Sequence, residues 1–181
     1  PLTQEICALA SFKALYTFSW ITEISAHDSL TEILNLQVFS INKQKSVRES
    51  IPKLQKISNQ VSLAVQSQYE ENPYPRWMYT QLKDKPISLG AFIQLTNLRT
   101  FEHETLNCES PNILIAGCGT GQHAIQVASL FRNSCILAVD ISTNSLAYAK
   151  SKAEELGIES IEFMQADILS LSELGQRFDI I

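Results

Sequence analysis

Residues 112–121 have the sequence Asn-Ile-Leu-Ile-Ala-Gly-Cys-Gly-Thr-Gly, a short apolar run that opens directly onto three closely spaced glycines. A short apolar run bounded by glycine is typical of a strand that is buried on both faces. A glycine-rich turn after such a strand lets the backbone approach a ligand closely, where a side chain would collide with it. This stretch therefore predicts a strand followed by a ligand-binding turn. The candidate contacts in it are Ala116, Gly117, Cys118, Gly119 and Gly121.

Strand and helix patterns alternate after this turn. Apolar residues at helical spacing occur over 124–130, a second apolar run covers 135–139, a helical pattern follows over about 145–156, and a third run covers 161–165. Phe178 then begins a fourth run. Strands that alternate with helices through short connections form parallel sheets with right-handed crossovers. The pattern predicts a Rossmann-like, doubly wound α/β sheet, of which residues 111–181 supply the first three strands and the start of the fourth.

Acidic residues stand where two of these strands end. Asp140 follows the second run, about 20 residues after the glycines, which is the spacing at which an acidic side chain accepts ribose hydroxyls in nucleotide-binding folds. Asp167 follows the third run, and with Ile168 it suits the amino group and ring face of an adenine. Asp140 and its neighbour Ile141, together with Asp167 and Ile168, are therefore candidate cofactor contacts. The alternatives are a helix cap for Asp140 and a plain surface carboxylate for Asp167.

The glycine spacing separates two classes of cofactor. Dinucleotide sites carry the pattern GxGxxG, whereas the glycines here are compressed into Gly117-x-Gly119-x-Gly121. This stretch resembles the first motif of class I S-adenosylmethionine-dependent methyltransferases, and the resemblance continues through residues 139–142, 145–149 and 165–169 in the expected order. It implies S-adenosylmethionine as the cofactor and methyl transfer to an acceptor that the sequence does not identify. Transfer from a sulfonium needs mainly alignment of the acceptor, so we assign no catalytic residue.

The segment before this domain carries a second motif. Residues 68–77 have the sequence Gln-Tyr-Glu-Glu-Asn-Pro-Tyr-Pro-Arg-Trp. They resemble the signature that precedes the methyltransferase domain in a bacterial family often fused to tetratricopeptide repeats, which would be a route to protein partners. We expect residues 69–110 to form an ordered linker or cap, with Tyr69 and Arg76 as candidate cofactor contacts if the segment closes over the pocket. The alternative is that these residues attach the helical region to the domain.

Residues 1–68 are predicted to be helical. Asp28 or Ser29 suits the start of a helix that carries Leu30 and Val38, the polar residues 42–49 suggest a connector, and Pro52 suits the first turn of a further helix. The apolar positions of that last helix are Leu54, Ile57, Val61 and Val65.

Composition narrows the range of functions. The formal charge of −5 includes no Lys/Arg run, which disfavours binding to a phosphate backbone, and the apolar residues 6–24 are interrupted by polar ones, which disfavours a membrane span. The four cysteines lack metal-ligand spacing and fit a reducing, cytoplasmic location. For Cys118 we favour packing, and for His123 a helix-surface role. His27 and His103 belong to no recognisable pattern, and no metal site is expected.

Three other interpretations remain beside a methyltransferase. A Rossmann oxidoreductase using NAD(P) is disfavoured by the glycine spacing. An amino-methyltransferase with Asn72-Pro73-Tyr74 as its acceptor motif lacks the expected Pro-Pro-aromatic order. A module that binds the cofactor or a partner without turnover is the third. Because the sequence starts without methionine and stops within its fourth apolar run, we also expect a C-terminally truncated piece of a longer protein that has no turnover by itself.

Overall fold

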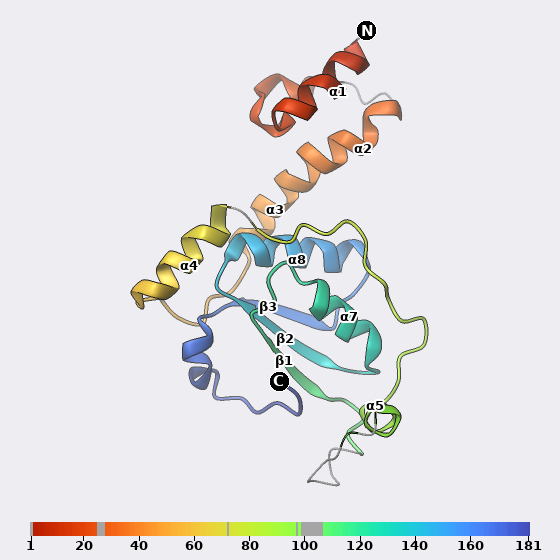
Figure 1. The fold of residues 1–181 in the computed structure, drawn as a ribbon, viewed down its shortest axis with the longest axis vertical. Coiled ribbons are helices and arrows are strands. Elements are labelled where there is room, and N and C mark those ends of the chain that lie inside the picture. The colour runs from red at the N-terminus through yellow and green to blue at the C-terminus, as the bar shows by residue number, and fades with distance from the viewer. Residues whose placement is uncertain (1, 25–27, 72, 97, 99–106) are drawn as a thin grey trace. The chain divides into compact units, whose positions relative to one another are not determined.

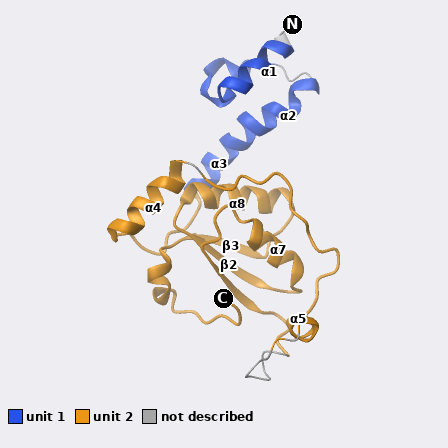
Figure 2. Cartoon of the chain, in the orientation of Figure 1, with its two compact units in different colours: residues 1–49 blue, residues 50–181 orange. Residues whose placement is uncertain are grey.

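A computed structural model describes residues 2–24, 28–71, 73–96, 98 and 107–181 of the chain (Figure 1). The predictions on His27, Asn72 and His103 therefore concern residues outside this part. The chain divides into two compact units, residues 1–49 and residues 50–181 (Figure 2). The sequence predicts a boundary after residue 68, whereas this division falls after residue 49, with helix α4 (Gln60–Glu71) packed against helix α8 (Thr143–Glu155) inside the second unit.

The first unit is built from helices. Helix α1 (Leu2–Phe12) is followed by 3-10 turns over Leu15–Thr17, Ser19–Glu23 and Asp28–Leu30. Helix α2 (Thr31–Leu34), the π-helical turn η4 (Asn35–Phe39) and helix α3 (Ser40–Glu49) then continue directly from one another. The buried core of the unit consists of Ile6, Leu15, Ile21, Leu30, Leu34 and Val38.

The prediction of a connector over residues 42–49 was wrong. None of the residues of α3 is buried, so the segment gives no amphipathic signal. Its Lys, Gln, Arg and Glu residues are nevertheless good helix formers, and the helical turns of residues 31–39 before it supply the nucleus that an isolated segment would lack.

The second unit contains the predicted parallel sheet. Strands β1 (Asn112–Ala116), β2 (Cys135–Asp140) and β3 (Ile161–Gln165) lie in the order β1-β2-β3. Their register places Ile113 opposite Ile136 and Ile136 opposite Ile161. The bounds of β1 and β3 agree with those predicted, β2 extends one residue further to Asp140, and the Rossmann-like α/β class is confirmed.

Both outer edges of this sheet gain a further partner. Ile180 forms a parallel bridge with Ile113, and the Leu114 N–H donates to the Ile180 carbonyl at 2.9 Å. Because β2 occupies the other edge of β1, the chain crosses over β1 after β3, which creates the switch point where α/β folds bind ligands. At the opposite edge, Lys53 forms a parallel bridge with Gln165. Residues 52–59 are not helical, with a bend at Leu54 and Gln55, and the helix predicted to start near Pro52 begins at Gln60.

The two faces of the sheet are covered differently. Helices α7 (Gln122–Leu130) and α8 cover one face, and their apolar residues Ala124, Ile125, Leu146 and Ala149 are fully buried. The 3-10 helix η5 (Ile168–Leu174) belongs to the other face, where Leu171 and Leu174 pack with Leu54, Met164 and Phe178 on Leu114, Leu137 and Val139. Alternate residues of each strand thus enter separate apolar layers.

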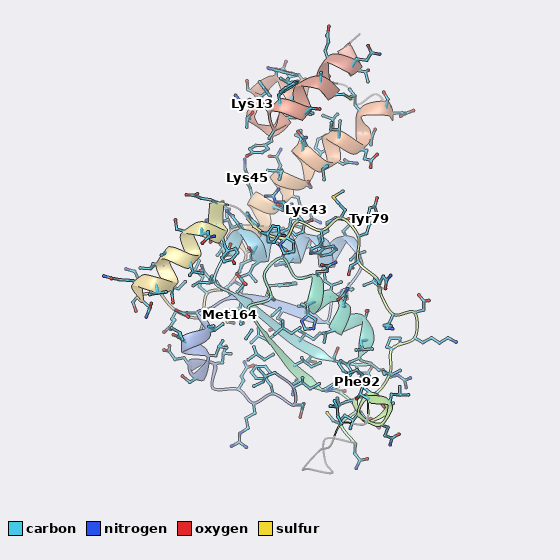
Figure 3. The ribbon with its side chains drawn as sticks, in the orientation of Figure 1. Lys13, Lys43, Lys45, Tyr79, Phe92 and Met164 are labelled. Atoms are coloured by element: carbon cyan, nitrogen blue, oxygen red, sulfur yellow. The ribbon has the colours of Figure 1, made fainter. Side chains whose placement is uncertain are left out.

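The linker before β1 is anchored along α7. The side chains of Gln122 and Gln126 donate to the Tyr79 carbonyl and to Thr80 Oγ1, at 3.4 and 3.0 Å. Just after the end of α7, Phe131 forms a parallel β-bridge with Ile87 of the linker. Helix α5 (Leu89–Thr96) follows and contains Phe92, labelled in Figure 3. The Phe92 ring lies edge-on to the Phe131 ring, with 5.2 Å between the two ring centres. The described part of the linker therefore contacts α7 and Phe131 at several points. No helix among the described residues has both the length and the apolar character needed to cross a membrane.

Candidate functional site

A cavity of about 640 Å³ lies at the carboxyl ends of β1, β2 and β3. The glycine turn after β1 and the segments that follow β2 and β3 line it on one side, and α4 and the start of the linker line it on the other. The carboxyl edge of a parallel sheet is where α/β proteins bind ligands, and the volume is within the range of small-molecule pockets. Its lining residues are Val61, Ser62, Val65, Tyr69, Tyr74, Pro75, Gly117, Cys118, Gly119, Thr120, Gln122, His123, Asp140, Ile141, Ser145, Asp167, Ile168 and Leu169.

The three glycines of the turn have different positions. All three have φ between +53° and +81°, a conformation that residues with a side chain adopt at an energetic cost. Gly117 and Gly119 line the cavity, and a Cβ on Gly117 would meet nothing within 4 Å. Gly121 is buried under α8 instead, where a Cβ would overlap that of Ala149. Gly121 therefore permits close packing of α7 on α8, and the predicted ligand contact at this position is not seen in the cavity lining.

Asp140 connects the glycine turn to the start of α8. Its carboxylate accepts hydrogen bonds from the Gly119 N–H at 2.8 Å and from the Ser142 N–H at 2.9 Å, and the side chain lines the cavity. Burial raises the pKa of Asp140 above its ordinary value, although the N–H groups of Ser142 and Gly119 act in the opposite direction and the charge of Glu70 adds to the rise. A carboxylate has about four acceptor sites, so these bonds leave Asp140 able to accept a further hydrogen bond from a ligand.

This raised pKa predicts a pH dependence of stability. The folded state holds a proton on Asp140 more readily than the unfolded state does, so the free energy of unfolding falls as pH rises from about 3.8 through the raised pKa. Urea unfolding of the wild type and of Asp140→Asn over the acid range measures this contribution. We expect any stability advantage of the wild type over the variant to shrink as pH rises, and an advantage that grows would contradict it.

The segment after β3 forms the third side of the site. Asp167 is buried and caps η5, with its Oδ1 accepting the Leu169 N–H at 3.0 Å. Ile168 and Leu169 are 59% and 70% exposed and line the cavity. Two large apolar side chains beside a carboxylate suit a flat heteroaromatic ring that carries an amino group.

Helix α4 provides a wall that the sequence did not predict. Val61, Val65 and Tyr69 follow one another at intervals of four residues and line the cavity. The spacing of the two valines predicts a helix, which is observed, but their side chains are 72% and 39% exposed. Spacing identified the common face, but not whether protein or a cavity lies opposite it.

Residues 68–77 contact the glycine turn and α8 at Trp77. Its Nε1 donates to the Thr120 carbonyl at 3.0 Å, Thr120 Oγ1 donates to the Pro75 carbonyl at 2.6 Å, and the Tyr148 hydroxyl donates to the Trp77 carbonyl. The Arg76 guanidinium lies 5.9 Å from the centre of the Tyr148 ring. Of the two predicted contacts in this segment, Tyr69 lines the cavity and Arg76 does not.

The other candidate residues also include some that line the cavity and some that do not. Ala116 is exposed at the end of β1 but is absent from the cavity lining, whereas Ile141 and His123 are part of it. Burial raises the pKa of the Cys118 thiol well above its ordinary value, and the charge of Asp140 adds to the rise, so the thiol stays protonated and unreactive. Within the described residues, no group of three or more His, Cys, Asp or Glu side chains is placed to hold a metal ion.

Comparison with known proteins gives a partial match. Residues 109–181 match a family model described as a methyltransferase domain. A tRNA (guanine-N(7)-)-methyltransferase from Chloroflexus aggregans is 40% identical over 68 residues, which are 34% of this chain and 30% of that protein. Galactitol 1-phosphate 5-dehydrogenase from Escherichia coli is 44% identical over 71 residues, 38% of this chain and 20% of that protein. The chain spans 17% to 30% of the length of the curated relatives it matches.

The structural similarities are also limited in extent. The structure of PKMT2 from Rickettsia typhi in complex with AdoHcy is 28% identical, with a TM-score of 0.42, over 60% of this chain and 20% of that one. The family match and the site geometry together indicate S-adenosylmethionine as the cofactor.

Proposed function

We propose that this protein binds S-adenosylmethionine in the cavity at the carboxyl ends of β1, β2 and β3, as part of a methyltransferase that acts on an acceptor yet to be identified. The observation that carries this proposal is the meeting of three features in one cavity. These are the glycine turn with its exposed backbone, the Asp140 carboxylate after β2, and the Asp167-Ile168-Leu169 segment after β3.

Each of these features has a part in binding. The open space beside Gly117 allows a ligand to lie directly against the backbone of the turn. The remaining acceptor capacity of Asp140 suits the hydroxyls of a ribose, and its hydrogen bonds from Gly119 and Ser142 fix the carboxylate before the ligand arrives. Asp167 suits the adenine amino group, and Ile168 and Leu169 suit the adenine ring.

Bound S-adenosylmethionine supplies a methyl group on a positively charged sulfur, which is a good leaving group. The contribution of the chain is to hold the donor in one orientation and to keep water away from it. The apolar side chains of Val61, Val65, Tyr69 and Tyr74 serve that exclusion from the side of α4 and the linker.

The galactitol 1-phosphate dehydrogenase match makes a nicotinamide site the alternative to test. Titration calorimetry with S-adenosylhomocysteine, NAD⁺ and NADP⁺ distinguishes the two. We expect S-adenosylhomocysteine to bind and to be displaced by S-adenosylmethionine, with no heat from either nicotinamide dinucleotide. Binding of NAD⁺ or NADP⁺ with no binding of S-adenosylhomocysteine would overturn the proposal in favour of an oxidoreductase.

A further inference from the structure

Helix α4 is weakly held by apolar contacts, although it forms one wall of the cavity. All twelve of its residues are described, and Ser62 is the one among them that is buried. A helix of this length is marginal in water by itself and normally depends on an apolar face packed against the protein. The side chains of Val61, Val65 and Tyr69 are exposed and line the cavity, so they contribute little apolar packing between α4 and the rest of the protein. Polar contacts must therefore make a large contribution to its position.

Those contacts lie where the C-terminus of α4 meets the N-terminus of α8. Glu70 Oε1 accepts from the Thr143 N–H and from Thr143 Oγ1, both at 2.7 Å, and its Oε2 accepts from the Asn144 N–H at 3.1 Å. The first N–H groups of a helix have no partner within the helix, and a carboxylate there also interacts favourably with the helix dipole. Glu70 thus satisfies donors that belong to a helix 73 residues further along the chain.

Side chains at the start of α8 also donate hydrogen bonds to the last carbonyls of α4. The last carbonyls of a helix also lack partners within it. Asn144 Nδ2 donates to the Glu70 carbonyl at 2.6 Å, and Ser142 Oγ donates to the Tyr69 carbonyl at 3.2 Å. Each helix end therefore supplies partners to the other. We refer to this set of contacts, from Tyr69 and Glu70 to Ser142, Thr143 and Asn144, as the α4–α8 latch.

The latch is directly connected to the ligand-binding carboxylate. Ser142, which donates to the Tyr69 carbonyl through its hydroxyl, also donates its N–H to Asp140 Oδ1. Asp140 in turn accepts the N–H of Gly119 in the glycine turn. One continuous series of hydrogen bonds therefore runs from the end of α4 to the backbone of the turn. A displacement of α4 removes the cavity wall and breaks the bond to Tyr69 of Ser142, the residue whose N–H supports Asp140.

We propose that Glu70 is a positioning residue whose carboxylate, by capping α8, holds α4 closed over the cofactor cavity, so that the affinity for the cofactor depends on the α4–α8 latch. This inference rests on the proposed function for the identity of the ligand. Opening of the latch provides a path for entry and exit that leaves the strands in place. The wall is suited to such movement because little apolar surface has to be exposed when it opens.

The test compares Glu70→Gln with Glu71→Gln, an adjacent and exposed position at which the same charge is removed. We expect Glu70→Gln to weaken S-adenosylhomocysteine binding about tenfold, through faster dissociation, because hydrogen bonds to a charged group are lost. Asn144→Ala, which breaks the junction from the other side, should act in the same direction. Glu71→Gln should bind like the wild type. Equal affinities of Glu70→Gln and the wild type would overturn the latch.

A double-mutant cycle separates positioning from a general loss of stability. Val65→Ala removes a wall contact, so it should weaken binding in the wild type but have little effect in Glu70→Gln, where the wall is already displaced. Fully additive effects would overturn the proposal.

Amide hydrogen exchange of the free protein tests the latch without any ligand. We expect exchange in α4 and at Thr143 and Asn144 to be faster in Glu70→Gln than in the wild type, and unchanged exchange would overturn the latch. If the wild type fails to bind S-adenosylhomocysteine, the proposed function fails, while the exchange result still decides whether Glu70 holds α4.

Discussion

Gly121→Ala is expected to lower the free energy of unfolding by about 2–5 kcal/mol, the largest loss of stability that we predict for a single methyl group. Two effects add. The positive φ of 81° costs a residue with a side chain about 1–2 kcal/mol. The new Cβ would also overlap that of Ala149 and lie 3.1 Å from its Cα, an overpacking worth about 1–3 kcal/mol. Urea unfolding monitored by circular dichroism measures the loss.

Gly157→Ala provides the matched control. Gly157 has a similar φ of 68°, but a Cβ there would meet nothing within 4 Å, so the loss should be limited to the backbone cost of about 1–2 kcal/mol. Ala149→Gly should partly rescue Gly121→Ala, because it removes the atom that the new Cβ meets. Similar losses for the two glycine variants, with no rescue, would show that packing between α7 and α8 does not explain the glycine at position 121.

The strands were predictable because their signals are local. The apolar runs of β1 and β3 are bounded by glycine, proline or acidic residues, and the observed bounds are those predicted. The start of α8, predicted near residue 145, lies at Thr143, and Ser142 caps the helix through the Ser145 N–H. Once strand ends are known, the sheet topology brings the residues after them to one edge, which is why Asp140 and Asp167 line the same cavity.

Errors arose where a distant partner decided the local structure. Leu54 has the spacing of a helix face, but pairing of residues 52–54 with the edge of β3 keeps the segment extended. The capping role of Glu70 could not be predicted from the sequence, because a capping residue is normally found next to the helix that it caps. Glu70 caps α8, whose first residue lies 73 positions further along the chain. The motif groups Gly121 with the other two glycines as a ligand contact, which stays a prediction, and its close approach to Ala149 of α8 gives no signal in the sequence.

Asp140→Asn is expected to weaken S-adenosylhomocysteine binding by about 1.5–3 kcal/mol, which is roughly a 10- to 150-fold rise in Kd. The substitution changes a carboxylate that accepts on both oxygens into an amide with one acceptor and one donor group. In the wild type one oxygen accepts the Gly119 N–H and the other accepts the Ser142 N–H. The amide NH₂ of Asn must therefore face one of these donors, and charge-assisted bonds to the ribose hydroxyls are lost as well.

Asp179→Asn is the matched control for this change. Asp179 also accepts a backbone N–H, that of Asn112 at 2.8 Å, but at the amino end of β1, away from the cavity. Titration calorimetry at neutral pH should give an unchanged Kd for Asp179→Asn. If the Kd of Asp140→Asn is also unchanged, Asp140 does not bind the ribose. The proposed ribose position would then be wrong, because no other carboxylate in the described cavity lining follows β2. A loss of folding without a loss of affinity in the remaining folded fraction would leave Asp140 as a support of the glycine turn alone.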